Sequence, residues 1–182
     1  KFKGTSQKMK NILIILIAIT LFACTSNIPK KEKGYEIGQK SVTYVDESRK
    51  RPLVTEIWYP TYDTKKKENS DDRPVFKTIQ TIHDASVPDR KFPLLLVSHG
   101  TGGNRFSLTW FVERMVKEGY IVVSMDHFGN STFNKLPREF VKWWERAIDV
   151  KYVLTKLLNE SDIGTKIDRS KIGGVGFSLG GY

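Results

Sequence analysis

The residues best suited to chemistry lie in the pentapeptide Gly176-Phe177-Ser178-Leu179-Gly180, which has the pattern G-x-S-x-G. A serine hydroxyl becomes a useful nucleophile when its backbone pushes it out of a sheet and within reach of a base. In such a nucleophile elbow, the positions two before and two after the serine need glycine because the strand and helix backbones nearly touch there. With glycine at about 7% of residues, the pattern arises by chance in on the order of one chain in ten of this length, so its surroundings must support it.

Three short apolar runs supply that support. Residues 171–175 (KIGGV) precede the elbow, are led in by the turn-like residues 168–170, and predict a buried strand. Residues 92–98 (FPLLLVS) form an unbroken apolar run that ends in the turn HGTGG at 99–103, and residues 120–125 (YIVVSM) form another. Such runs are typical of parallel strands that are buried on both faces.

Helical patterns separate these runs. Apolar residues at helical spacing lie on one face of the chain between the runs 92–98 and 120–125, and again before the run 171–175. Gly119 predicts the end of the first of these two helices. The alternation predicts an α/β fold, with a mostly parallel sheet and helices on both of its faces. The two apolar faces are Leu108, Phe111, Val112, Met115 and Val116, and then Trp143, Ala147, Val150, Leu154 and Leu157.

The chain before this unit contains fewer elements. Residues 41–46 and 53–59 predict two strands joined by the polar turn 47–51, as an antiparallel hairpin at the sheet edge. Residues 62–91 are rich in Lys, Asp and Glu without periodicity, which predicts a long surface loop that carries His83 as a solvated residue. No internal repeat or second domain is visible, so we expect residues 41–182 to form part of one domain, truncated after the elbow.

The N-terminal residues resemble a secretory signal. Met9, Lys10 and Asn11 precede an apolar stretch, and residues 21–24 (LFAC) match a bacterial lipoprotein signal box. We therefore predict a signal peptide over residues 1–23, with 1–8 upstream of the start methionine, a lipidated Cys24, and a tether over 24–40. This predicts a lipid-anchored, extracytoplasmic protein of the bacterial cell envelope. A transmembrane anchor is the alternative, although the stretch is short of the roughly 20 apolar residues that spanning needs.

The net charge of +10 does not indicate a nucleic-acid partner. Residues 1–40 hold eight lysines against two glutamates, which accounts for +6 of that charge. Lysines beside the predicted anchor would meet anionic lipid headgroups, and a solvated tether is equally compatible. No basic stripe with interleaved aromatic residues is present, and neither a metal-ligand cluster nor a nucleotide-binding loop is visible. We therefore expect no nucleic acid, no metal and no cofactor.

Taken together, the motifs of residues 42–182 resemble the N-terminal part of an α/β-hydrolase. Within that fold the chain is most similar to bacterial relatives of platelet-activating-factor acetylhydrolase, often labelled predicted dienelactone hydrolases. Dienelactone hydrolases proper use a cysteine nucleophile, so the serine in this chain favours the acetylhydrolase-like relatives, which cleave esters. Besides the elbow and the HGTGG turn, the features that carry the resemblance are Trp58-Tyr59-Pro60, Asp126-His127-Phe128-Gly129-Asn130, Arg146, Asp149 and Asp168.

The resemblance implies a role for several residues. Ser178 would attack a carboxylic ester and form an acyl-enzyme, and the backbone N–H groups of Thr101 and Leu179 would stabilise the oxyanion. The substrate would be a small ester or a phospholipid-like molecule. The resemblance gives structural roles to His99 and His127. Independently of it, Arg146 and Asp149 could pair at their helical i,i+3 spacing.

The catalytic acid and histidine follow the nucleophile in this fold, whereas all three histidines of the chain precede Ser178. We therefore expect the acid and the base beyond Tyr182, and this chain alone to be nearly inactive. With its elbow strand exposed as an apolar edge, the chain alone should also be poorly soluble. Two alternatives stay open: a peptidase or acyltransferase on the same fold, and a noncatalytic membrane-anchored lipoprotein.

Overall fold

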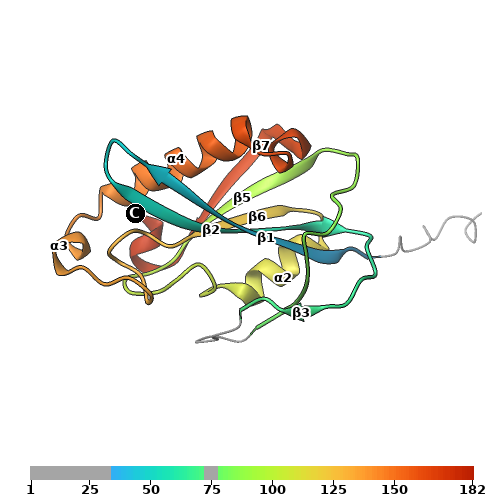
Figure 1. Ribbon diagram of the computed structural model, residues 1–182, viewed down its shortest axis with the longest axis horizontal. Helices are drawn as coiled ribbons and strands as arrows, with labels where there is room; N and C mark the ends of the chain where they lie inside the picture. Colours follow the sequence, from blue (N-terminus) through green and yellow to red (C-terminus); the bar gives the residue numbers. More distant parts are fainter. Residues whose placement is uncertain (1–33, 72–77) are drawn as a thin grey trace, which may run out of the picture. The chain divides into compact units, whose positions relative to one another are not determined.

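The computed structural model describes residues 34–71 and 78–182 (Figure 1). The predicted signal peptide and Cys24 lie outside the described residues. The described strands form one sheet in the order β3-β4-β1-β2-β6-β5-β7. The elements are β1 (Glu36–Asp46), β2 (Arg51–Thr61), β3 (Glu68–Asn69), β4 (Gln80–His83), β5 (Phe92–Ser98), α2 (Thr109–Lys117), β6 (Ile121–Met125), α3 (Pro137–Phe140), α4 (Glu145–Glu160) and β7 (Ile167–Gly176), with short 3-10 helices at Ile163–Lys166 and Ser178–Gly181.

The parallel part of the sheet confirms the predicted α/β architecture. Strand β5 pairs in parallel with β6 on one side and with β7 on the other, and Leu96 lies opposite both Val123 and Gly174. Because parallel strands end at the same edge, the residues that follow β5, β6 and β7 gather there. These residues include the HGTGG turn and the elbow. Strand β7 is the outermost strand of the sheet within the described residues.

Two hydrophobic cores cover the two faces of the sheet, with α2 on one side and α4 on the other (Figure 1). Side chains alternate between the cores along each strand, so both faces need apolar residues, and the runs read as unbroken. On the α2 side, the core includes Trp58, Val97, Val112, Val116 and Val122. On the α4 side, it includes Ile57, Leu94, Leu96, Ile121, Val123, Val153 and Leu157.

The predicted hairpin is present, but its length and place differ from the prediction. Strands β1 and β2 pair antiparallel from Asp46 opposite Arg51 to Glu36 opposite Thr61, so the sheet begins within the predicted tether. The hairpin is also not at the sheet edge, because β4 pairs in parallel with β1 and β3 pairs with β4. Both outer strands come from the predicted loop over 62–91. They pair over only two residues each, too short to leave an alternating pattern in the sequence. His83 ends β4 and is exposed, as expected.

The buried face of α4 matches the predicted apolar stripe only in part. Arg146, Asp149, Val153 and Leu157 are the buried residues of the helix, whereas Ala147 is exposed. Leu157 of the predicted stripe is buried, and Val150 and Leu154 pack partly buried against the core, but the stripe missed Arg146 and Asp149 because these two residues are charged. These two charged residues lie at the end of the helix nearest the candidate site.

Candidate active site

The pentapeptide around Ser178 has the geometry of a nucleophile elbow. Ser178 directly follows β7 and Phe177, has a φ of 52°, and is exposed. This left-handed conformation costs a residue other than glycine about 1–2 kcal/mol. A Cβ atom added to Gly176 would overlap the carbonyl oxygen of Gly180, and one added to Gly180 would overlap that of Ser98. The small residues are therefore required by backbone contact.

The turn after β5 lies against the elbow. A Cβ atom added to Gly100 would be 3.3 Å from the Cβ atom of Ser178. The Phe177 N–H donates a hydrogen bond to the Ser98 carbonyl oxygen at 3.1 Å, and Gly102 turns the chain with a φ of +66°. The structure thus brings Ser178 together with the turn that contains Thr101, and Leu179 follows the serine at the start of the 3-10 helix.

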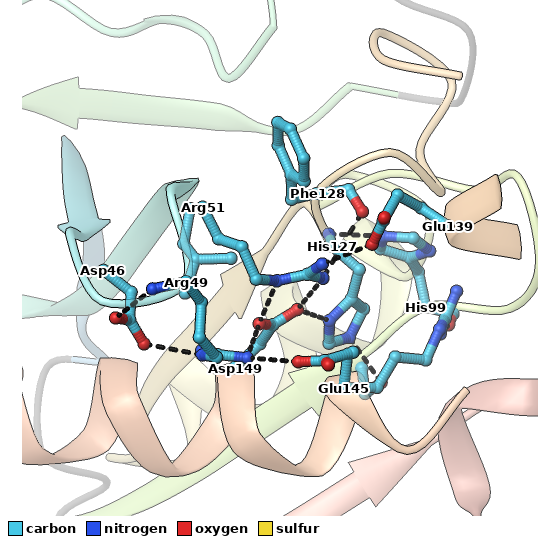
Figure 2. A network of polar contacts seen from close by, with 12 residues as sticks. Asp46, Arg49, Arg51, His99, His127, Phe128, Glu139, Glu145 and Asp149 are labelled. Carbon is cyan, nitrogen blue, oxygen red and sulfur yellow. Dashed lines mark hydrogen bonds and ion pairs between the residues drawn. The ribbon is translucent and has the colours of Figure 1, made fainter. Parts of the chain in front are cut away.

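A buried chain of hydrogen bonds joins a second serine to His127 and Asp149, and Figure 2 shows the histidine and the aspartate. His127 Nε2 lies 3.0 Å from Ser98 Oγ, and His127 Nδ1 lies 3.1 Å from Asp149 Oδ2. Since a carboxylate can only accept, Nδ1 carries the proton and Nε2 accepts from the Ser98 hydroxyl. Burial lowers the pKa of His127, which keeps the ring neutral. The array has the order of a catalytic triad, but its serine is not the one in the elbow.

Two arginines of the β1–β2 hairpin neutralise Asp149. Arg51 binds the carboxylate through two nitrogens at 2.9 Å each, and Arg49 Nη1 lies 3.0 Å away (Figure 2). Burial would raise the pKa of Asp149, but hydrogen bonds from His127 and Arg51 outweigh it, and the pKa is lowered. The predicted pairing of Arg146 with Asp149 is wrong. Arg146 instead donates to the carbonyl oxygens of His99 and Gly100.

His99 is a buried, neutral link between the ends of β5 and β6. Its Nδ1 lies 2.7 Å from the Gly100 carbonyl oxygen, so Nδ1 carries the proton, and its Nε2 accepts from the His127 N–H at 3.3 Å. Burial is the largest cause that lowers the pKa of His99 to about 3, and the neighbouring His127 and Arg146 act in the same direction. With both ring nitrogens engaged and a depressed pKa, His99 is not a base for Ser178.

A second charged cluster, which we did not anticipate from the sequence, joins the segment after the HGTGG turn to the end of β6 and to β2. Arg105 Nη1 lies 2.6 Å from Asp126 Oδ2, and Arg105 Nε lies 3.2 Å from Glu56 Oε1. The Arg105 N–H also donates to Asp126 at 2.7 Å. The three residues come from three separate segments, so no local spacing could have identified them.

Within residues 34–71 and 78–182, no group of three or more His, Cys, Asp or Glu side chains is placed to hold a metal ion. No helix in that part of the chain has the length and apolar character needed to cross a membrane.

Comparisons with known proteins support the fold. No protein-family model matches the chain, and no curated protein matches its sequence. Among solved structures, the chain is similar to a ferulic acid esterase from Streptomyces cinnamoneus, with a TM-score of 0.66 and 19% sequence identity. The match covers 84% of this chain and 54% of the esterase, so the chain spans about half the length of that protein. The described chain therefore has an α/β-hydrolase-type fold.

Proposed function

We propose that the full-length protein is a serine-dependent carboxylic ester hydrolase that works through an acyl-enzyme on Ser178. The observation that carries this proposal is an exposed serine in a left-handed turn at the carboxyl end of a parallel strand, in contact with a glycine-rich turn. In the first step, Ser178 Oγ bonds to the ester carbonyl carbon while a base takes the hydroxyl proton. The alcohol then leaves with that proton, and water hydrolyses the acyl-serine.

The oxyanion that forms during attack needs hydrogen-bond donors already in place. We assign this role to the backbone N–H groups of Leu179 and Thr101. Leu179 follows the nucleophile directly, and Thr101 lies in the turn that contacts Ser178 through Gly100. Because both donors belong to the backbone, the side chains at these two positions are of little importance to the reaction.

The base and its acid partner are proposed to lie beyond Tyr182. His83 ends β4, which is far from β7 in the strand order, and His99 and His127 are buried with both ring nitrogens bonded. Asp149 is already bound by two arginines. None of these groups is free to serve Ser178.

We further propose that the protein is an acetylhydrolase-like esterase, with a small ester or a phospholipid-like molecule as its substrate. The support is the set of sequence motifs, together with a serine in place of cysteine at position 178. Lipidation at Cys24 in the bacterial cell envelope would hold the enzyme beside lipid substrates. Profiling the full-length protein on short-chain esters, amides and acyl acceptors would separate an esterase from a peptidase or an acyltransferase.

The central test is nucleophile replacement in the full-length protein. We expect Ser178→Ala to abolish both 4-nitrophenyl acetate hydrolysis and covalent labelling by a fluorophosphonate probe. Ser98→Ala is the matched control because Ser98 is the serine of the buried histidine chain, and we expect this variant to keep the label on Ser178. Unchanged turnover in Ser178→Ala, or a label mapped to Ser98, would overturn the proposal, and a noncatalytic protein would take up no label at all.

A further inference from the structure

The carbonyl oxygen of Gly100 receives three hydrogen-bond donors. His99 Nδ1 lies 2.7 Å away, the Gly103 N–H 3.1 Å and Arg146 Nη2 3.3 Å. Arg146 also donates to the carbonyl oxygen of His99, so one guanidinium from α4 binds two consecutive carbonyl groups of the turn. The side chains of His99 and Arg146 are both buried.

The next N–H along the chain is the Thr101 amide. A trans peptide is planar, and its carbonyl and N–H groups point in opposite directions. No cis peptide bond occurs in the described residues, so the donors that fix the Gly100 carbonyl also fix the direction of the Thr101 N–H. Among residues 34–71 and 78–182, that N–H has no hydrogen-bond partner. It is a free donor, in a turn whose Gly100 packs against Ser178.

Arg146 differs from three other arginines of this region, which are buried or partly buried. Arg49, Arg51 and Arg105 each bind carboxylates, whereas Arg146 forms no ion pair within the described part of the chain. Its Nε is buried without a hydrogen-bond partner in that same part. Although Asp149 attracts Arg146 electrostatically, burial is the larger effect and lowers the pKa of Arg146. Burying a guanidinium without a paired carboxylate is costly, and packing alone would favour an apolar side chain here.

We propose that Arg146 is a positioning residue for ester hydrolysis, which holds the peptide between Gly100 and Thr101 so that the Thr101 N–H faces the developing oxyanion. The inference rests on the proposed function and adds a residue to it. A planar guanidinium can bind two neighbouring carbonyl groups at once, whereas a lysine ammonium is a single point of charge. From within the turn, the neutral His99 adds a further hydrogen bond to the Gly100 carbonyl oxygen.

The test compares two substrates of the full-length protein, 4-nitrophenyl acetate and its thiono analogue, in which sulfur replaces the carbonyl oxygen. Sulfur is the weaker hydrogen-bond acceptor, so an oxyanion donor accelerates the oxygen ester more. Removing one such donor costs about 100- to 1,000-fold in kcat, so we expect a misdirected donor in Arg146→Gln to cost about 10- to 100-fold on the oxygen ester. The thionoester should lose much less, and Arg146→Lys should regain part of the difference.

Matched variants separate positioning from packing. Arg49→Gln removes an arginine from the neighbouring buried network that does not touch the turn, so its ratio of oxygen-ester to thionoester rates should equal that of the wild type. If Arg146→Gln fails to fold, Thr101→Pro tests the same idea by deleting the N–H itself, and it should lower the ratio.

An equal loss on both substrates in the Arg146 variants would show a packing role and overturn the inference, as would a wild-type ratio in Thr101→Pro. Labelling of Ser178 by the fluorophosphonate probe reports on the proposed function separately. If the wild-type protein keeps that label but the Arg146 variants keep the wild-type ratio of oxygen-ester to thionoester rates, the proposed function stands and the positioning role fails.

Discussion

His127 Nε2 lies 3.0 Å from Ser98 Oγ, and the hydroxyl proton of Ser98 points at the ring as in a resting catalytic triad. Yet both the ring and the Asp149 carboxylate behind it are fully buried, and two arginines bind that carboxylate. We therefore interpret this array as a structural brace that ties the end of β5 to the end of β6 and to α4.

Replacing the ring of this brace should affect stability more than reactivity. We expect His127→Ala to lower the free energy of unfolding by about 3 kcal/mol, because it opens a cavity and leaves Ser98 and Asp149 each short of a buried partner. Urea denaturation measures the loss, and fluorophosphonate labelling of Ser178 should persist at low temperature. Loss of labelling in a variant that is still folded would contradict the structural role of His127.

The two arginines on Asp149 should differ in their effect. Arg51 binds the carboxylate through two nitrogens and is almost fully buried, so Arg51→Met should cost about 3–5 kcal/mol by uncovering a buried charge. Arg49 is 18% exposed, and its loss leaves Arg51 in place, so Arg49→Met should cost less. Chemical denaturation of both variants gives the comparison, and equal losses would argue against the dominance of Arg51.

Stability should fall with acid because His99 is buried in its neutral form. Its pKa is lowered from 6.5 to about 3, so between these values the unfolded chain binds a proton that the folded chain does not. The stabilisation is therefore complete above pH 6.5 and is lost as the pH falls towards 3. His99→Gln should reduce the slope of unfolding free energy against pH in this window by up to about 1.4 kcal/mol per pH unit. An unchanged slope between pH 7 and pH 5 would show that His99 titrates normally.

Backbone strain at Ser178, the proposed nucleophile, predicts a stabilising substitution. Ser178 has a φ of 52°, which glycine adopts without the penalty of about 1–2 kcal/mol that a Cβ atom brings. Ser178→Gly should therefore melt at a higher temperature than Ser178→Ala, although both lack the hydroxyl. A higher melting temperature for the alanine variant would mean that residue 178 is not held in a left-handed turn.

The sequence predicted the parts of the fold in which apolar residues are the buried ones and glycines mark the turns. The run over 92–98 coincides with β5, and Gly119 ends α2 with a φ of +91°. The elbow was recognisable because backbone contacts require its two glycines, which lie at a fixed spacing from Ser178 in the sequence. In contrast, the buried face of α4 was predicted only in part, because Arg146 and Asp149 are charged and their partners lie 47 and 98 residues away.

The segment 168–170 was predicted as a turn before the elbow strand, and the structure shows an irregularity within that strand instead. It lies inside β7, not before it, but the pairing with β5 is irregular there, since Phe92 is opposite Ile167 and Leu94 is opposite Ile172. Asp168 accepts hydrogen bonds from the backbone N–H and the hydroxyl of Ser170. The polar residues thus mark a bulge in a strand, which a sequence pattern does not distinguish from a turn.

One turn of α4 supplies both Arg146, which holds the carbonyl groups of the HGTGG turn, and Asp149, which anchors His127 and the hairpin arginines. Each residue of an α-helix rotates the chain by about 100°, so a single-residue deletion between these positions would swing one charge away from its partners while leaving the other in place. Related proteins should therefore have no insertions or deletions in this stretch of the helix, although they can carry other residues at exposed positions such as Ala147 and Ile148.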